Sequence, residues 1–144
     1  MRFFFVLVVL SISVAGSASA AESGARAVLD RGMATYKSSG ASAGLKALTK
    51  NGPLAGEKTL AGVVNNLRTV EDAFGTFEGY DVIREQTITP RVRMIFFVLY
   101  YAKSIAYGRF TGYQLSSGEW VANGFTFNTD PSELIPSVVI FKGQ

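Results

Sequence analysis

Neither cysteine nor histidine occurs anywhere in the 144-residue chain. Without cysteine no disulfide can form, so the fold has to be held together by its core. The same two absences exclude Ser-His and Cys-His nucleophile pairs, and also metal sites made of imidazole or thiolate groups. Any catalysis would have to use Asp, Glu, Tyr, Lys or Arg, and we expect neither a metal ion nor another cofactor.

Concentrated charge is also absent. The sequence has 14 Lys and Arg residues against 11 Asp and Glu residues, a net charge of +3, and they are dispersed along the chain. A nucleic-acid-binding protein needs a basic patch or stripe on one face. We therefore expect no nucleic-acid partner.

The longest apolar run is short and lies at the N-terminus. Arg2 precedes an apolar run over Phe3–Val14, and the small residues Ala18-Ser19-Ala20 follow it. This order is typical of a secretory signal peptide with an A-x-A cleavage site. A membrane anchor is the alternative, but a spanning helix needs about 20 apolar residues. We expect a signal peptide over residues 1–20, and an exported protein, periplasmic or secreted, with no stable membrane anchor after cleavage near Ala20.

The rest of the chain, residues 21–144, has the length of one domain. Apolar residues three to four apart predict a helix over 22–38, which Ser38-Ser39-Gly40 ends or kinks, and a short second helix within 41–50. The strongest helical pattern runs over 57–74 and stops at Gly75. One apolar stripe carries this pattern: Leu60, Val63, Val64, Leu67, Val70 and Phe74.

Alternation with a period of two replaces the helical pattern after Gly75. It predicts a first strand over 80–88 and then three strands over 91–102, 105–115 and 119–128. Two-residue tips at Lys103-Ser104 and Ser117-Gly118 would join the last three strands. Helices followed by such strands predict an α+β fold, with the N-terminal helices on one face of a curved antiparallel β-meander.

A cluster of oxygen-bearing side chains follows the last of these strands. Asp130, Pro131 and Glu133 lack the alternating acidic spacing of a calcium loop. They match an N-cap, a first helical residue and a capping-box partner, which predicts one short helical turn. The apolar run Val138–Phe141 then predicts a short strand or a tail packed along an edge.

Two-residue tips would fix which side chains share a face of the sheet, because side chains alternate along a strand. We call the first set the phenylalanine face: Ile95, Phe97, Leu99, Tyr101, Phe110, Val121, Asn123, Phe125 and Phe127, with Gly108 and Gly112 between them. We call the second set the tyrosine face: Met94, Phe96, Val98, Tyr100, Tyr107, Arg109, Thr111, Tyr113, Trp120, Ala122 and Thr126. We expect the helices to cover the phenylalanine face. A register slip of one residue would invert this assignment.

The tyrosine face is too apolar for a face that water covers. Large exposed apolar patches usually mark contact sites, and a homodimer is the simplest way to cover one. The expected interface residues are Tyr100, Tyr107, Arg109, Tyr113 and Trp120.

The order of elements resembles the nuclear-transport-factor-two-like fold of the cystatin-like superfamily, and small exported bacterial proteins of that fold. The stripe Leu60–Phe74, the strand Met94–Tyr101, Gly108-Arg109-Phe110 and the run Trp120–Asn128 carry the resemblance. The resemblance implies a cone-shaped domain used by isomerases, dehydratases, ligand carriers and dimerisation modules. Fold alone does not choose among them.

We expect a non-enzymatic binding or interaction protein of the cell envelope. A cavity under the helices could hold a small apolar ligand among Phe97, Phe110, Phe125 and Asn123, although a close-packed core is the alternative.

The other possibility is an enzyme. The resemblance implies that an isomerase or dehydratase would place an acid and tyrosines deep in the cone. Here the candidates are Asp81 with Tyr80 or Tyr101. An acid at a helix-to-strand turn more often caps or faces water.

Overall fold

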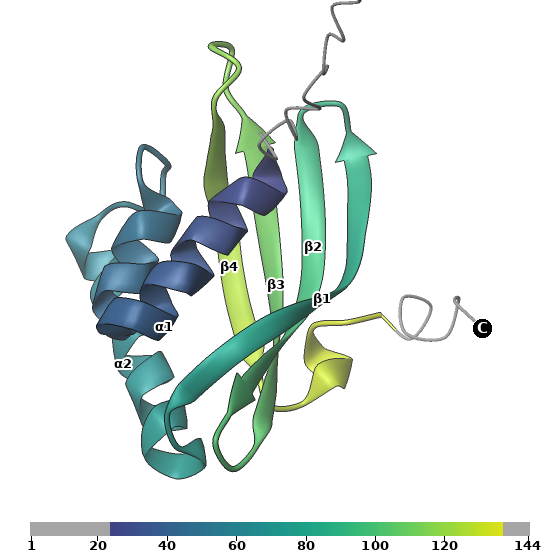
Figure 1. The fold of residues 1–144 in the computed structure, drawn as a ribbon. Helices are drawn as coiled ribbons and strands as arrows, with labels where there is room; N and C mark the ends of the chain where they lie inside the picture. The colour runs from purple at the N-terminus through teal and green to yellow at the C-terminus, as the bar shows by residue number, and fades with distance from the viewer. Residues whose placement is uncertain (1–23, 137–144) are drawn as a thin grey trace, which may run out of the picture.

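The computed structural model describes residues 24–136, which form helices followed by an antiparallel sheet (Figure 1). The predicted α+β class, with the helices first, is confirmed. The expected signal peptide over 1–20 and the expected C-terminal strand or tail Val138–Phe141 lie outside the described residues. The elements are α1 (Ala25–Thr49), α2 (Glu57–Phe74), β1 (Phe77–Thr89), β2 (Val92–Tyr101), β3 (Ile105–Gln114), β4 (Trp120–Asn128) and the 3-10 turn η1 (Pro131–Glu133).

The first helix folds back on itself at Gly40, which confirms the predicted kink. Gly40 has φ 86°, a left-handed conformation that only glycine adopts without strain. A Cβ on Gly32 would lie 2.7 Å from the Cβ of Leu48, so the two segments of α1 pack side by side. The described part of the chain contains no helix long and apolar enough to cross a membrane.

The four strands form one sheet in the order β1-β2-β3-β4, with every neighbouring pair antiparallel. β1 and β4 are therefore the two edges of the sheet. In Figure 1, β1 starts beside the C-terminal end of α2 and is visibly curved along its length. Register irregularities interrupt the pairing of β1 with β2 at three places, between Phe77 and Gly79, Val82 and Arg84, and Thr87 and Thr89.

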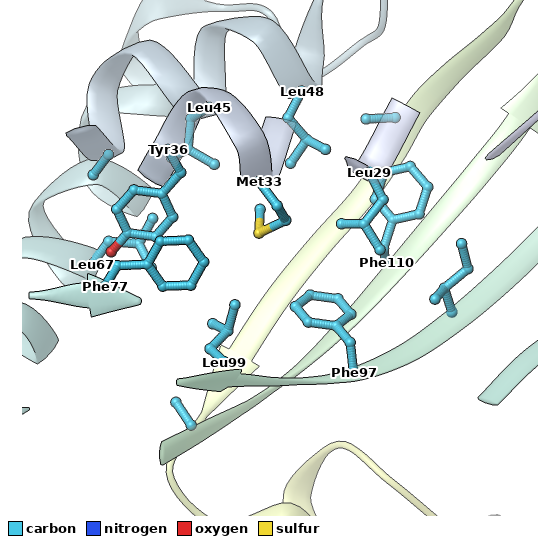
Figure 2. Close-up of a cluster of buried hydrophobic side chains, with 14 of the residues drawn as sticks. Leu29, Met33, Tyr36, Leu45, Leu48, Leu67, Phe77, Phe97, Leu99 and Phe110 are labelled. Carbon is cyan, nitrogen blue, oxygen red and sulfur yellow. The ribbon is translucent and has the colours of Figure 1, made fainter. Parts of the chain in front are cut away.

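The helices cover the phenylalanine face, as predicted. Ile95, Phe97, Leu99 and Phe110 are fully buried in one cluster with residues of α1. In Figure 2, Phe97, Leu99 and Phe110 lie under Leu29, Met33 and Leu48 of α1. A Cβ on Gly108 would lie 2.2 Å from the ring of Phe97. The glycine therefore makes room for a core side chain that fills it, and no cavity remains at that point.

The two predicted hairpin tips are both wrong by one residue. The β2–β3 tip is Ala102-Lys103, because the Tyr101 N–H donates to the Ser104 carbonyl. This places Ile95 opposite Phe110 and leaves the faces of these two strands as predicted. The β3–β4 tip has three residues, since the Leu115 N–H donates to the Glu119 carbonyl.

The predicted faces of four residues of β4, Trp120 to Asn123, are wrong because of a bulge and the three-residue tip before it. Thr111 pairs with Gly124 but Gly112 pairs with Ala122, so Asn123 has no partner of its own. Between the three-residue tip and this bulge, every side chain points to the opposite side from the prediction. Ala122 and Trp120 therefore pack against the main core, Val121 moves to the tyrosine face, and Asn123 is exposed. Beyond the bulge, the predicted pairing of Phe110 with Phe125 is confirmed.

The end of the described chain covers part of the tyrosine face. Asp130 caps η1 as predicted, since its carboxylate accepts from the Ser132 N–H at 2.9 Å. The turn delivers Leu134 and Ile135 onto Phe96, which is only 2% exposed. Met94 and Tyr107 pack around this second, smaller cluster. The turn η1 and the two residues after it thus cover the part of the tyrosine face around Phe96.

Candidate functional site: the groove between α2 and β4

The apolar stripe of α2 is only half covered by the rest of the molecule. Leu67 is fully buried and Val64 is 8% exposed. Val63 and Val70 belong to the same stripe but are half-buried. Since no third helix or fifth strand among the described residues covers them, α2 overhangs the edge of the sheet.

A groove lies between this overhang and β4. Its volume is about 470 Å³, within the range of pockets that bind small molecules. Five consecutive residues of the strand and the turn after it line one wall, Phe125 to Thr129. Successive side chains of a strand point to opposite faces. All five can line one groove only because the groove runs along the outer edge of the strand.

The floor of the groove adjoins a smaller apolar depression of about 70 Å³. Val63 and Phe125 line both spaces, so the two lie next to each other. The depression is closed by the second segment of α1 and the loop after it. Its further lining residues are Leu45, Thr49, Leu54, Thr59 and Leu60.

None of the side chains that line the groove is charged. The apolar walls are Val63, Val70, Phe125 and Phe127, and the polar groups are the amides of Asn66 and Asn128 with three threonine hydroxyls. Thr69 donates its hydroxyl to the Asn65 carbonyl at 3.0 Å, and Asn128 accepts from the Asp130 N–H at 3.0 Å. The groove therefore suits an uncharged, mainly apolar occupant with a few groups that hydrogen-bond.

The four residues predicted to bind a ligand are not brought together. Phe97 and Phe110 are fully buried in the close-packed core, which is the alternative considered from the sequence. Phe125 lines the groove, and its ring centroid lies 6.0 Å from that of Phe97. Asn123 is exposed at the bulge, because the bulge turns it away from the phenylalanine face.

The three residues considered for catalysis also lie apart. Asp81 is exposed and pairs with Val98, which puts it on the tyrosine face. Tyr80 lies on the opposite face, where its hydroxyl donates to the carboxylate of Asp30. Tyr101 is buried deeper in the core, and its hydroxyl lies 3.4 Å from that of Tyr36.

The electrostatics of the two core tyrosines oppose proton transfer. Burial is the largest cause that raises the pKa of Tyr36 far above its usual value, and the Tyr101 hydroxyl adds to it. Burial likewise raises the pKa of Tyr101. Both phenols therefore stay neutral at any physiological pH. The pKa of Tyr100 is also raised, mainly by its hydrogen bond with Asp81 on the tyrosine face.

The five residues predicted to form an interface differ in their exposure, and they do not all lie on the same face of the sheet. Tyr100 is 37% exposed, whereas Tyr107 packs beside the η1 cluster. The Tyr113 ring lies under the Arg91 guanidinium, 5.0 Å from its central carbon. Arg109 is half-buried on the same face, opposite Phe96. Trp120 belongs to the other face, as the bulge requires.

The sequence reasoning missed two features. The first is the link from α1 to β1, in which Arg26 bonds Asp30 at 2.9 Å and lies over the Tyr80 ring. The spacing of four between Arg26 and Asp30 was its only sequence signal. The second is the groove itself.

No protein-family model, curated protein or solved structure matches the chain.

Proposed function

We propose that the chain is an exported, non-enzymatic binding protein that acts through the groove between α2 and β4. The observation that carries the proposal is the uncovered half of the α2 stripe. Val63 and Val70 face an open space of about 470 Å³ whose other wall is the edge of β4. Apolar surface that faces a hollow is stabilised when an apolar partner fills it.

Two further observations support binding over catalysis. The only acid considered for catalysis, Asp81, is exposed on the far side of the sheet from Tyr80 and Tyr101. The groove, by contrast, offers amides and hydroxyls but no charged side chain. Such a lining orients a bound group without supplying an acid or base for proton transfer. The signal-like residues 1–20 support export to the periplasm or beyond.

A titration with N-phenyl-1-naphthylamine, a neutral apolar dye, tests this proposal. The protein is used at nanomolar concentration, so that self-association does not compete. We expect saturable fluorescence enhancement, and Asn66→Arg should weaken it at least about tenfold, because a charged side chain then occupies the apolar groove.

The matched control is Asn65→Arg. Asn65 is the neighbouring residue of α2, is also exposed, and lines the separate depression between α1 and α2. It should leave dye binding unchanged. Equal effects of the two substitutions, or no saturable binding by the wild-type chain, would contradict the proposed function.

A further inference from the structure

We infer that the natural occupant of the groove is the β4 strand of a second copy of this chain, paired antiparallel to β4 across a twofold axis at Thr126. This inference rests on the proposed function and names the partner of the same site. A fifth strand beside β4 would lie beneath the overhanging α2. There it would contact Val63 and Val70, which are only half-buried.

The composition of β4 suits pairing with itself. The nine residues Trp120–Asn128 include no charged side chain and no proline. In a twofold pair the residue on the axis meets its own copy, so a charge there would face a like charge. A neutral strand avoids that repulsion. Edge strands that must stay unpaired usually carry charge, proline or bulges, and the part of β4 beyond its bulge has none of them.

The alternation of residues selects the register. Gly124–Asn128 reads Gly-Phe-Thr-Phe-Asn, which is regular after the bulge at Asn123. An axis at Thr126 sets Phe125 opposite Phe127 of the second copy on the helix side of the sheet. Thr126 meets Thr126 of the second copy on the other side. Aromatic pairs and threonine pairs are both favourable across antiparallel strands.

The surface of α2 leaves room for the second copy. An axis perpendicular to the sheet puts both α2 helices on the same side, next to each other. The helix face beside the groove carries small, exposed residues, Gly62, Asn66, Thr69 and Ala73. A Cβ on Gly62 would meet no atom within 4 Å. The two helices can therefore approach without a clash of large side chains.

The chain's lack of cysteine makes a cross-linking experiment clean, because an introduced cysteine is the only thiol. Directly opposed residues of antiparallel strands have Cα atoms about 4.5–5.5 Å apart, which fits a disulfide. We expect Thr126→Cys to form a disulfide-linked dimer under mild oxidation at micromolar concentration. Thr87→Cys on β1 is the control, since Thr87 is also an exposed threonine of an edge strand. It should cross-link at least about tenfold more slowly.

Sedimentation of the wild-type chain completes the test and should show a dimer at micromolar concentration. A wild-type monomer, or equal cross-linking of the two cysteine variants, would overturn the inferred dimer. If dye binding still responded to Asn66→Arg in that case, the proposed function would stand with another occupant. If the dimer formed while dye binding ignored Asn66→Arg, the proposed function would fail and the edge pairing alone would remain.

Discussion

The two edge strands of the sheet differ in how far they are protected from pairing. β1 carries four charged side chains, Glu78, Asp81, Arg84 and Glu85, and three register irregularities. β4 carries no charged side chain and has one bulge. Charges and bulges are the devices that keep a sheet edge from accepting another strand. The β1 edge is therefore better protected from pairing than the β4 edge.

One phenylalanine of each strand, Phe77 of β1 and Phe127 of β4, shows a different depth of burial. β1 begins inside the core, because Phe77 stacks on Tyr36 with ring centroids 4.1 Å apart. Phe77 also meets the Tyr101 ring edge-on at 5.7 Å. Phe127 of β4 is only half-buried and faces the groove. Phe77 is therefore anchored in the core, whereas Phe127 keeps part of its apolar surface exposed.

Truncation of one phenylalanine in each strand should show this difference most strongly. We expect Phe77→Ala to lower the free energy of unfolding by about 3–5 kcal/mol, the usual cost of a buried ring. Phe127→Ala should cost about half of that or less, because part of its surface is exposed in the monomer. Urea denaturation at nanomolar concentration measures both. Equal losses would show that β4 is as firmly anchored as β1.

A lysine substitution on each edge strand should show which edge forms the dimer. Here the quantity compared is the dissociation constant of the dimer and not the stability of the fold. Thr126 lies opposite Arg109 and Thr87 lies opposite Arg93, so either substitution puts lysine beside an arginine of the neighbouring strand. Only Thr126→Lys brings two lysines together at the twofold axis. We expect it to weaken the dimer by about 100-fold, close to 2.7 kcal/mol.

Sedimentation equilibrium over a concentration series measures this effect, with Thr87→Lys as the matched control. The control should keep the wild-type dissociation constant. Loss of the dimer in the Thr87 variant instead would place the pairing edge on β1 and reverse the comparison.

The limits of β2, β3 and β4 could be predicted from the sequence to within one residue, and the faces of most residues followed from them, whereas β1 begins at Phe77 and not at the predicted Tyr80. The prediction failed between Trp120 and Asn123, where the three-residue tip and the bulge act in opposite directions. Alternation across these residues reads equally well in either register, so no local signal marks the bulge. Ser117-Gly118 was identified as a turn, but the sequence did not fix the length of the tip.

The groove could not be predicted for a different reason. The apolar stripe of α2 was clear in the sequence, but its exposure depends on where the helix crosses the sheet. The fold-back of α1 at Gly40 places a second helical segment beside α2, where Val64 is buried and Val63 stays half-buried. Contacts between segments that are distant in the chain therefore determine which half of the α2 stripe stays exposed.

The hairpin that holds β4 should be sensitive to its glycine. Gly118 has φ 89°, and a left-handed conformation costs a residue with a Cβ about 1–2 kcal/mol. Gly118→Ala should therefore lower the melting temperature by about 4–8 °C per kcal/mol. Gly124→Ala is the control, because its Cβ would meet Thr111 at an ordinary 3.4 Å. Equal melting temperatures for wild type and Gly118→Ala would show that the tip relaxes to another turn.

The attachment of β1 should also depend on pH, through Tyr36. An unfolded tyrosine ionises near pH 10, whereas burial raises the pKa of Tyr36 in the folded state. Below about pH 10 the group is neutral in both states, so its contribution to stability is fully present. As the pH rises further, the unfolded state loses the proton first, and the free energy of unfolding falls.

Replacing Tyr36 by phenylalanine should remove that dependence. At pH 7, Tyr36→Phe loses the 3.4 Å hydrogen bond to Tyr101 and leaves that buried hydroxyl without this partner, a cost of about 1–3 kcal/mol. Above pH 10 its stability should fall less steeply than wild type, by about 1.4 kcal/mol per pH unit at most, since one proton fewer is released on unfolding. Urea denaturation between pH 7 and pH 11 measures the slope. Parallel curves above pH 10 would mean that Tyr36 ionises equally in both states, and that the anchor of β1 is more open to water than its 3% exposure indicates.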